Sequence, residues 1–163
     1  RYVIEVYKQG NDPIVHLNIN RNSVWSQPIP FDTWVFITGT YDGHMLRLFV
    51  NGELQDSLEV QILLDVAESN IFLGHGGPNS QYAGAFSGYL DELAIWKQAR
   101  TPSQIQEDMR AGLDPTQAGL VCYWPVFEDA GQILIDAKRN ANGQLGSSEN
   151  IDSDDPLRVL RTD

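Results

Sequence analysis

Cysteine and basic residues are scarce in this sequence. Cys122 is the one cysteine among 163 residues, so no disulfide can form within the chain. Lysine and arginine together number 11 against 22 aspartate and glutamate residues, which leaves a net charge of −11. Binding to a nucleic-acid backbone needs many basic side chains. The charge therefore argues against a nucleic-acid partner and is compatible with cation binding or with a solvated acidic surface.

Long hydrophobic runs and catalytic motifs are also lacking. No stretch approaches the roughly 20 consecutive apolar residues of a membrane-spanning helix, so we expect no membrane insertion. The sequence contains neither a His-Glu-x-x-His zinc motif nor a Gly-x-Ser-x-Gly nucleophile motif. Glycosidases need two carboxyl groups roughly 5–10 Å apart. Glu53 and Asp56 are three residues apart, which predicts that they lie on opposite faces of a strand. We therefore expect no enzymatic activity.

The strongest pattern in the sequence is the stretch 34–52, WVFITGTYDGHMLRLFVNG, in which apolar and polar residues alternate. This alternation predicts two β-strands. Asp42-Gly43 lies between them and Asn51-Gly52 follows the second, and such pairs tolerate the positive φ angles of tight hairpin turns. The stretch therefore predicts two successive hairpins of an antiparallel sheet. The residues predicted to share one face of the second strand are Leu46, Leu48 and Val50.

Other segments predict further strands and one helix. Thr101 is a helix cap, Pro102 suits the first helical position, and Gln104 completes a capping box. Gly112 is predicted to end this helix. Cys122 is predicted to be a buried strand thiol. The strands are predicted over residues 2–7, 14–20, 53–60 and 86–97, and the tryptophans predicted to lie in the core are Trp34, Trp96 and Trp124.

Three motifs, taken in order, resemble the laminin-G-like family of concanavalin A-like lectin/glucanase domains. The first is the stretch 34–52, the second is residues 86–96 (FSGYLDELAIW), and the third is 99–101 (ART) before the helix. The resemblance implies an all-β fold, an antiparallel β-sandwich of the jelly-roll type with one short helix. Members usually carry several strands before the point where this chain begins, so we expect the N-terminal strands to be missing.

The resemblance also implies a division of the chain and a class of function. Residues 1–112 would form the sandwich, and 113–163 a C-terminal extension that adds a strand to it or opens a next repeat. The implied function is a non-catalytic recognition or adhesion module of an extracellular or cell-surface protein, with a glycan or protein ligand. The alternative is a structural or ancillary domain of a larger secreted enzyme or assembly, with no ligand of its own. Metallopeptidases of the pappalysin type carry a similar domain.

The candidate ligand residues come from predicted loops and from one acidic position. Sugar-binding sites combine exposed aromatic side chains with polar amides, although a tryptophan in a loop can also be packed. Some relatives hold a structural Ca²⁺ with an aspartate at the position of Asp91, so the resemblance implies calcium there. The candidate ligand-binding residues are Trp25, His75, Asn79, Gln81 and Tyr82.

Overall fold

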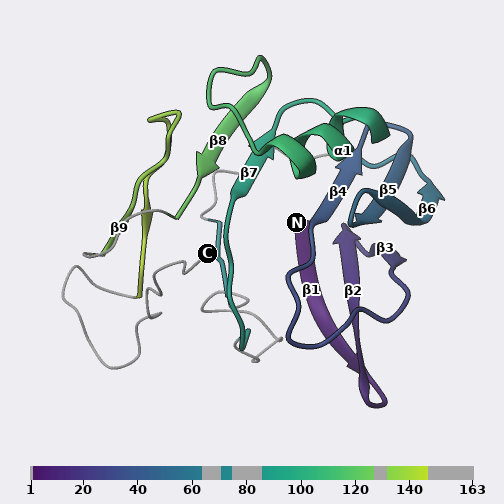
Figure 1. Cartoon of the computed structure of the whole chain (residues 1–163). Helices are drawn as coiled ribbons and strands as arrows, with labels where there is room; N and C mark the ends of the chain where they lie inside the picture. The colour runs from purple at the N-terminus through teal and green to yellow at the C-terminus, as the bar shows by residue number, and fades with distance from the viewer. Residues whose placement is uncertain (1, 64–70, 75–85, 127–131, 147–163) are drawn as a thin grey trace. The chain divides into compact units, whose positions relative to one another are not determined.

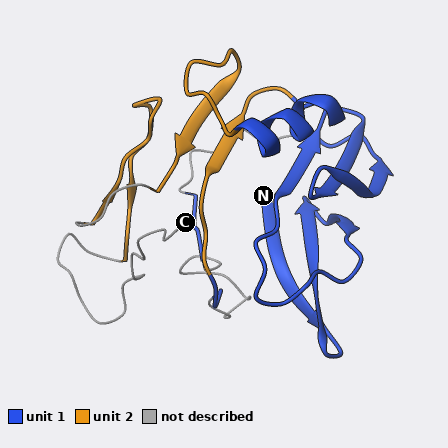
Figure 2. Ribbon diagram, in the orientation of Figure 1, with its two compact units in different colours: residues 1–88, 99–111 blue, residues 89–98, 112–163 orange. Residues whose placement is uncertain are grey.

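The computed structural model describes residues 2–63, 71–74, 86–126 and 132–146. Residue contacts divide the chain into two compact units (Figure 2): unit 1 is Arg1–Gly88 with Ala99–Ala111, and unit 2 is Tyr89–Gln98 with Gly112–Asp163. The sequence placed a boundary after residue 112. The contacts group Tyr89–Gln98 with the C-terminal part, because strand β7 (Leu93–Trp96) pairs there with strand β8 (Leu120–Trp124).

Unit 1 contains two three-stranded antiparallel sheets, with strand orders β1-β2-β3 and β4-β5-β6. Neighbours along the chain are neighbours in each sheet, and tight turns connect most of them (Figure 1). The strands are β1 (Tyr2–Gln9), β2 (Asp12–Ile19), β3 (Asn22–Trp25), β4 (Ile37–Tyr41), β5 (Met45–Val50) and β6 (Glu53–Glu59). The predicted all-β antiparallel architecture is confirmed.

The two sheets of unit 1 share one hydrophobic core. Gly39 of β4 lies so close to β2 that an added Cβ would stand 2.9 Å from Leu17 Cδ2, so the missing side chain permits this close packing. The prediction of one buried face on β5 is confirmed, because Leu46, Leu48 and Val50 are all in the core. The core residues are Val15, Leu17, Ile19 and Val24 from the first sheet and Leu46, Leu48 and Val50 from the second.

Both predicted hairpin turns are confirmed. The Asp42 Oδ1 atom accepts the backbone N–H groups of His44 at 3.0 Å and Met45 at 2.8 Å, which closes the β4–β5 turn. Asn51 and Gly52 have φ angles of 52° and 76°, and this left-handed pair makes the β5–β6 turn. Three of the four residues predicted to tolerate positive φ, namely Gly43 (96°), Asn51 and Gly52, therefore adopt it, whereas Asp42 does not.

The predicted helix is present as α1 (Pro102–Ala111), and its capping box is confirmed. The Thr101 N–H donates to Gln104 Oε1 at 2.9 Å, and the Gln104 N–H donates to Thr101 Oγ1 at 3.3 Å. Gly112 follows the helix with a φ of 76°. Among the described residues, no helix is long and apolar enough to cross a membrane.

A buried ion pair fixes α1 to the segment that precedes it. The Arg100 guanidinium donates to both carboxylate oxygens of Asp108, from Nη2 at 2.6 Å and from Nε at 2.9 Å. The side chains are 13% and 4% exposed. Such a two-point contact constrains both the position and the orientation of the helix.

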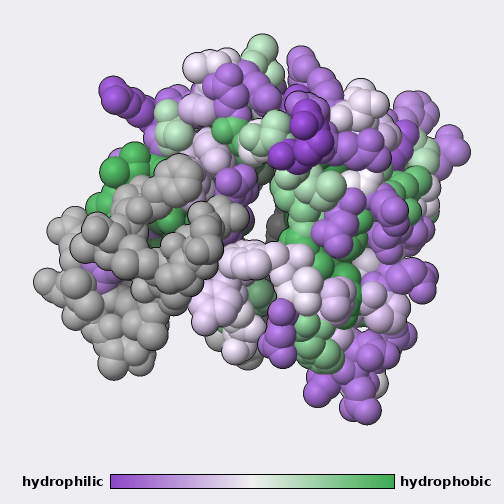
Figure 3. All heavy atoms as spheres, in the orientation of Figure 1, coloured by the Kyte–Doolittle hydropathy of each residue, from purple (hydrophilic) through white to green (hydrophobic). Residues whose placement is uncertain are grey.

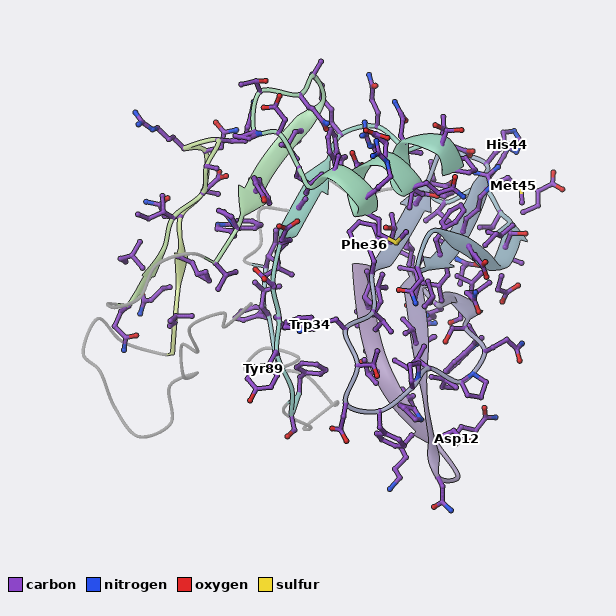
Figure 4. All side chains as sticks on the ribbon, viewed as in Figure 1. Asp12, Trp34, Phe36, His44, Met45 and Tyr89 are labelled. Atoms are coloured by element: carbon purple, nitrogen blue, oxygen red, sulfur yellow. The ribbon has the colours of Figure 1, made fainter. Side chains whose placement is uncertain are left out.

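Two predictions from the stretch 34–52 and its surroundings are wrong. Trp34 is not in the core: its side chain is 63% exposed (Figure 4). Strand β4 begins only at Ile37, since Asn51 Oδ1 accepts the Phe36 N–H at 2.9 Å and holds residues 34–36 outside the ladder. The strand predicted over 86–97 is reduced to β7 (Leu93–Trp96), because Glu92 has a φ of 51° and interrupts the extended backbone.

The expectation that Glu53 and Asp56 lie on opposite strand faces is also wrong. The register between β5 and β6 shifts between Leu48 and Phe49, so one extra residue is inserted in β6. Glu53 therefore pairs with Val50 and Asp56 with Leu48, two positions on the same face. The Asp56 carboxylate is occupied by backbone donors, since it accepts the N–H of Trp25 at 3.1 Å and of Ser57 at 2.7 Å.

The described residues of unit 2 form two short strand pairs. Strand β7 pairs with β8 (Leu120–Trp124), and β9 (Ile133–Leu134) pairs with β10 (Gly143–Gln144). Its core contains Cys122, Trp124 and Leu134, which confirms the prediction of a buried thiol. Burial raises the pKa of the Cys122 thiol, and the neighbouring Asp136 carboxylate raises it further.

Asp136 organises the loop between β9 and β10. Its side chain is fully buried, and its two oxygens accept four backbone N–H groups at 2.8–3.0 Å. Burial of the carboxyl acts to raise its pKa, but these four hydrogen bonds outweigh burial and leave the pKa below its usual value. The donors are Tyr123, Lys138, Asn140 and Ala141.

Candidate functional site

One row of side chains crosses all three strands of the first sheet. Glu5 of β1 pairs with His16 of β2, and His16 pairs with Trp25 of β3. Paired residues of an antiparallel sheet point to the same face, and the core residues Val15 and Leu17 occupy the opposite face. The row therefore lies on the face that points away from the core. We call this face the outer face and define it by Glu5, Tyr7, His16, Asn18, Ser23 and Trp25.

Three aromatic rings meet on the outer face. The His16 ring stacks on the Trp25 ring, with centroids 3.8 Å apart and planes inclined by 16°. Tyr7 stands nearly perpendicular to both, at 6.1 Å from His16 and 6.0 Å from Trp25. Because Tyr7 is equally distant from two rings that are stacked on each other, it lies at the edge of the stack and not on its open end.

Hydrogen bonds hold the imidazole of His16 at both nitrogens. Nδ1 lies 3.1 Å from Glu5 Oε2, and Nε2 lies 2.9 Å from Ser23 Oγ. Ser23 Oγ also accepts an N–H from Asn18 Nδ2 at 2.8 Å. These contacts form a continuous chain across β1, β2 and β3, in which each polar group has a partner. His16 itself is buried.

The backbone around Trp25 is anchored on both sides. Its own N–H donates to Asp56 Oδ2 at 3.1 Å. The next residue, Ser26, donates its N–H to the Val15 carbonyl at 2.9 Å, and its Oγ accepts the Val15 N–H at 2.8 Å. The indole is thus carried by a fixed strand end and not by a free loop, as a preformed binding site requires.

A hollow adjoins the exposed side of the aromatic cluster. Its volume is about 390 Å³, which falls within the range of small-molecule sites. Trp25 is 41% exposed although His16 covers one of its ring faces. Part of the Trp25 side chain is therefore accessible beside the hollow. The residues that line the hollow are Tyr7, Lys8, Gln9, Ile14, Trp25 and Ser26.

The five predicted ligand-binding residues stay predictions, and the structure describes one of them. Trp25 is on the outer face, whereas His75, Asn79, Gln81 and Tyr82 lie outside the described residues. The missed residues are Glu5, Tyr7, His16 and Ser23. The signal for Glu5, Tyr7 and His16 was present in the alternation of the first two predicted strands, Glu5-x-Tyr7 and His16-x-Asn18, whereas Ser23 lies outside those strands. Only the register between β1 and β2, which the turn between them sets, shows that Glu5 and His16 lie side by side.

Asp91 lies in unit 2 beside a second acid. It is half-buried, and its Oδ1 accepts the Glu92 N–H at 2.8 Å. Burial raises the pKa of Tyr123 to about 12, and the charges of Glu92 and Asp91 add to this effect. Within the described part of the chain, no three His, Cys, Asp or Glu side chains gather into a metal-binding group. A calcium ion at Asp91 would need backbone carbonyls and water as its remaining ligands.

Comparison with known families decides the classification. The family model of the concanavalin A-like lectin/glucanases superfamily matches residues 1–106. The chain belongs to this superfamily. The laminin-G-like resemblance of the motifs is thereby confirmed, and the match covers the two sheets of unit 1, the outer face and the start of α1.

The chain is similar to short segments of two much longer proteins. It is 32% identical to human pappalysin-1 over 114 residues, which is 67% of this chain and 6% of that protein. It is 32% identical to mouse pappalysin-1 over 79 residues, or 47% of this chain and 5% of that one. A crystal structure of a candidate carbohydrate-binding protein from Bacteroides ovatus superimposes with a TM-score of 0.75 at 21% identity, covering 88% of this chain and 44% of that one.

Proposed function

We propose that this chain is a non-catalytic glycan-recognition module of a longer extracellular or cell-surface protein, in an adhesive or targeting role. The observation that carries the proposal is the exposed side chain of Trp25, which stacks on His16 with one ring face and lines the hollow. Flat aromatic faces at the protein surface suit the apolar face of a sugar ring. The description of a structural neighbour as a candidate carbohydrate-binding protein supports the same reading.

The arrangement of carboxylates supports a non-catalytic role. On the sheet β1-β2-β3, Glu5 is in contact with His16, and Asp12 lies at the far end of the β1–β2 hairpin (Figure 4). Four residues separate them along the ladder, which corresponds to about 13 Å. This exceeds the spacing of glycosidase pairs. On β6, Asp56 lies on the same face as Glu53, but its carboxylate already accepts the backbone N–H groups of Trp25 and Ser57.

A matched pair of tryptophan substitutions tests the proposed function. Trp25→Ala should abolish binding to immobilised neutral polysaccharides, because it removes the stacking surface. Trp34→Ala removes another exposed indole that is not part of the outer face, and it should leave binding unchanged. Binding of the two variants and the unmodified protein would be measured on a panel of β-glucan, galactan and mannan. Equal binding by Trp25→Ala and the unmodified protein would refute the proposal.

Calcium support at Asp91 is the second part of the proposal and has its own test. A ligand that binds only the folded state raises the unfolding free energy, by about 2.7 kcal/mol at a concentration of 100 times its Kd. We expect a midpoint several degrees higher in calcium than in chelator, and Asp91→Asn should remove this difference. An Asp114→Asn variant, altered at an exposed acid of the same unit, should keep it. Identical midpoints with calcium and with chelator would exclude calcium.

A structural role in a larger protein is the second candidate function. Ile4 and Val6 of β1 point to the core side of the sheet, since they pair with Leu17 and Val15, yet they are 51% and 42% exposed. Hydrophobic surface is also visible among hydrophilic residues on unit 1 (Figure 3). The similarity to a short part of pappalysin-1 is consistent with a parent chain that covers this surface. If this role is the main one, glycan binding should be absent, and fusion to the neighbouring domains of the parent should raise the unfolding temperature.

A further inference from the structure

We propose that His16 is the positioning residue of the outer face, and that the site accepts uncharged pyranose rings on one face of Trp25. This inference rests on the proposed glycan-binding function and adds the class of ligand and the residue that selects it. Three features carry it: the fixed imidazole, the single open indole face and the distribution of charge.

The imidazole of His16 cannot turn away from Trp25 without losing hydrogen bonds. An ionised Glu5 carboxylate can only accept, so Nδ1 is the nitrogen that carries a proton toward Glu5. On the other side, Nε2 meets Ser23 Oγ, which is itself held by Asn18. A rotated ring would leave buried polar groups without partners. His16 therefore acts as a rigid support behind the indole.

This support limits Trp25 to a single binding face. The face toward His16 is closed at a centroid distance of 3.8 Å, and no sugar ring fits into that space. Tyr7 closes an edge of the stack. A sugar can reach only the opposite face, where the hollow of about 390 Å³ begins. The site thus takes one ring stacked on its apolar face, and it cannot clamp a ring between two aromatic side chains.

The charges near the site disfavour acidic sugars. Glu5 belongs to the outer face, and Asp12 lies on the same side of the sheet, opposite Gln9. Lys8 also lines the hollow, but it pairs with Pro13, so its side chain points to the other face of β1. The whole chain carries −11 charges. Uronic or sulfated rings would be repelled by this field, whereas neutral hexoses would not.

Two His16 variants separate positioning from general stability. His16→Ala removes the support, and we expect the affinity for a neutral polysaccharide to fall about fivefold, since an aromatic contact contributes about 1 kcal/mol. His16→Phe keeps a flat ring against the indole and loses the hydrogen bonds, so it should recover part of the affinity. His44→Ala, altered at an exposed histidine in the β4–β5 turn, is the matched control and should bind normally. Affinity would be followed by tryptophan fluorescence on the folded proteins, with the unfolding temperature measured beside it.

The outcomes distinguish failure of this inference from failure of the proposed function. Loss of binding in Trp25→Ala together with normal binding in His16→Ala would overturn the role of His16 and leave glycan recognition standing. Preference for heparin or polygalacturonate over neutral polysaccharides would overturn the ligand class. Absence of binding to all of these glycans would overturn both proposals. Weaker binding of His16→Ala with partial recovery in His16→Phe, at unfolding temperatures that permit folding, would support the inference.

Discussion

Replacing Asp136 with alanine should destabilise unit 2 by at least about 3 kcal/mol. The substitution removes the acceptor of four backbone N–H groups in a site with no solvent exposure. Each buried donor left without a partner costs about 1–3 kcal/mol. Denaturant unfolding followed by tryptophan fluorescence would measure the loss, because Trp124 lies in the core of this unit.

The control for this substitution is Asp114→Ala. Asp114 is exposed, and its Oδ1 atom accepts hydrogen bonds from the N–H and the Oγ1 hydroxyl of Thr116, each at 2.7 Å. Its replacement should destabilise the unit far less than Asp136→Ala does, because water can replace the lost acceptor. If Asp136→Ala cost no more than this control, Asp136 would not be the organising residue of the loop.

The same carboxylate predicts a pH dependence with a defined sign. The folded-state pKa of Asp136 lies below the unfolded value of about 3.9. The ionised carboxylate therefore contributes its full stabilisation above about pH 4. This stabilisation is lost as the pH falls below that value and through the lower pKa of Asp136 in the folded protein. Asp136→Asn should lose this part of the acid dependence. An unchanged acid profile in that variant would show that other carboxylates are responsible.

Replacing Asp108 with alanine should destabilise unit 1 by about 3–5 kcal/mol. The substitution leaves the Arg100 guanidinium buried without its two-point acceptor, and breaking a buried pair by removing one partner typically costs this amount. The helix α1 should also lose protection against hydrogen exchange, since the pair fixes it to the preceding segment. Both effects can be measured on the purified protein.

The neighbouring residue on the same helix provides the control. Glu107 forms an ion pair with Arg110 at 2.8 Å, but these side chains are 58% and 72% exposed. Exposed pairs of this kind contribute little to stability, because solvent screens them. Glu107→Ala should therefore change stability very little. A similar cost for the two variants would mean that burial of the Arg100–Asp108 pair is unimportant.

Local sequence signals predicted those parts of the fold whose causes are local. The turn at Asn51-Gly52 requires positive φ, and the helix cap at Thr101 and Gln104 requires side chains three residues apart. Both requirements can be read from neighbouring residues. The burial of Leu48 also followed from alternation along a single strand.

The failures arose where a pairing partner decides the outcome. Trp34 continues the alternation of the strand but stands outside the ladder, because a distant side chain, Asn51, takes over the Phe36 N–H. Glu53 and Asp56 lie on the same face of β6, and not on opposite faces as predicted, because of a β-bulge that no local sequence motif indicates. For the same reason, sequence analysis found Trp25 and missed His16, whose importance depends on the register across three strands.

The most direct test of the central claim is an NMR titration of the four indole N–H signals with a neutral oligosaccharide. Their residues are Trp25, Trp34, Trp96 and Trp124. We predict a concentration-dependent shift of the Trp25 signal, because the sugar ring would stack on its open face, and no shift of the Trp34 signal. A shift confined to Trp34, or no shift of Trp25 at saturating sugar, would contradict the assignment of the outer face as the glycan site.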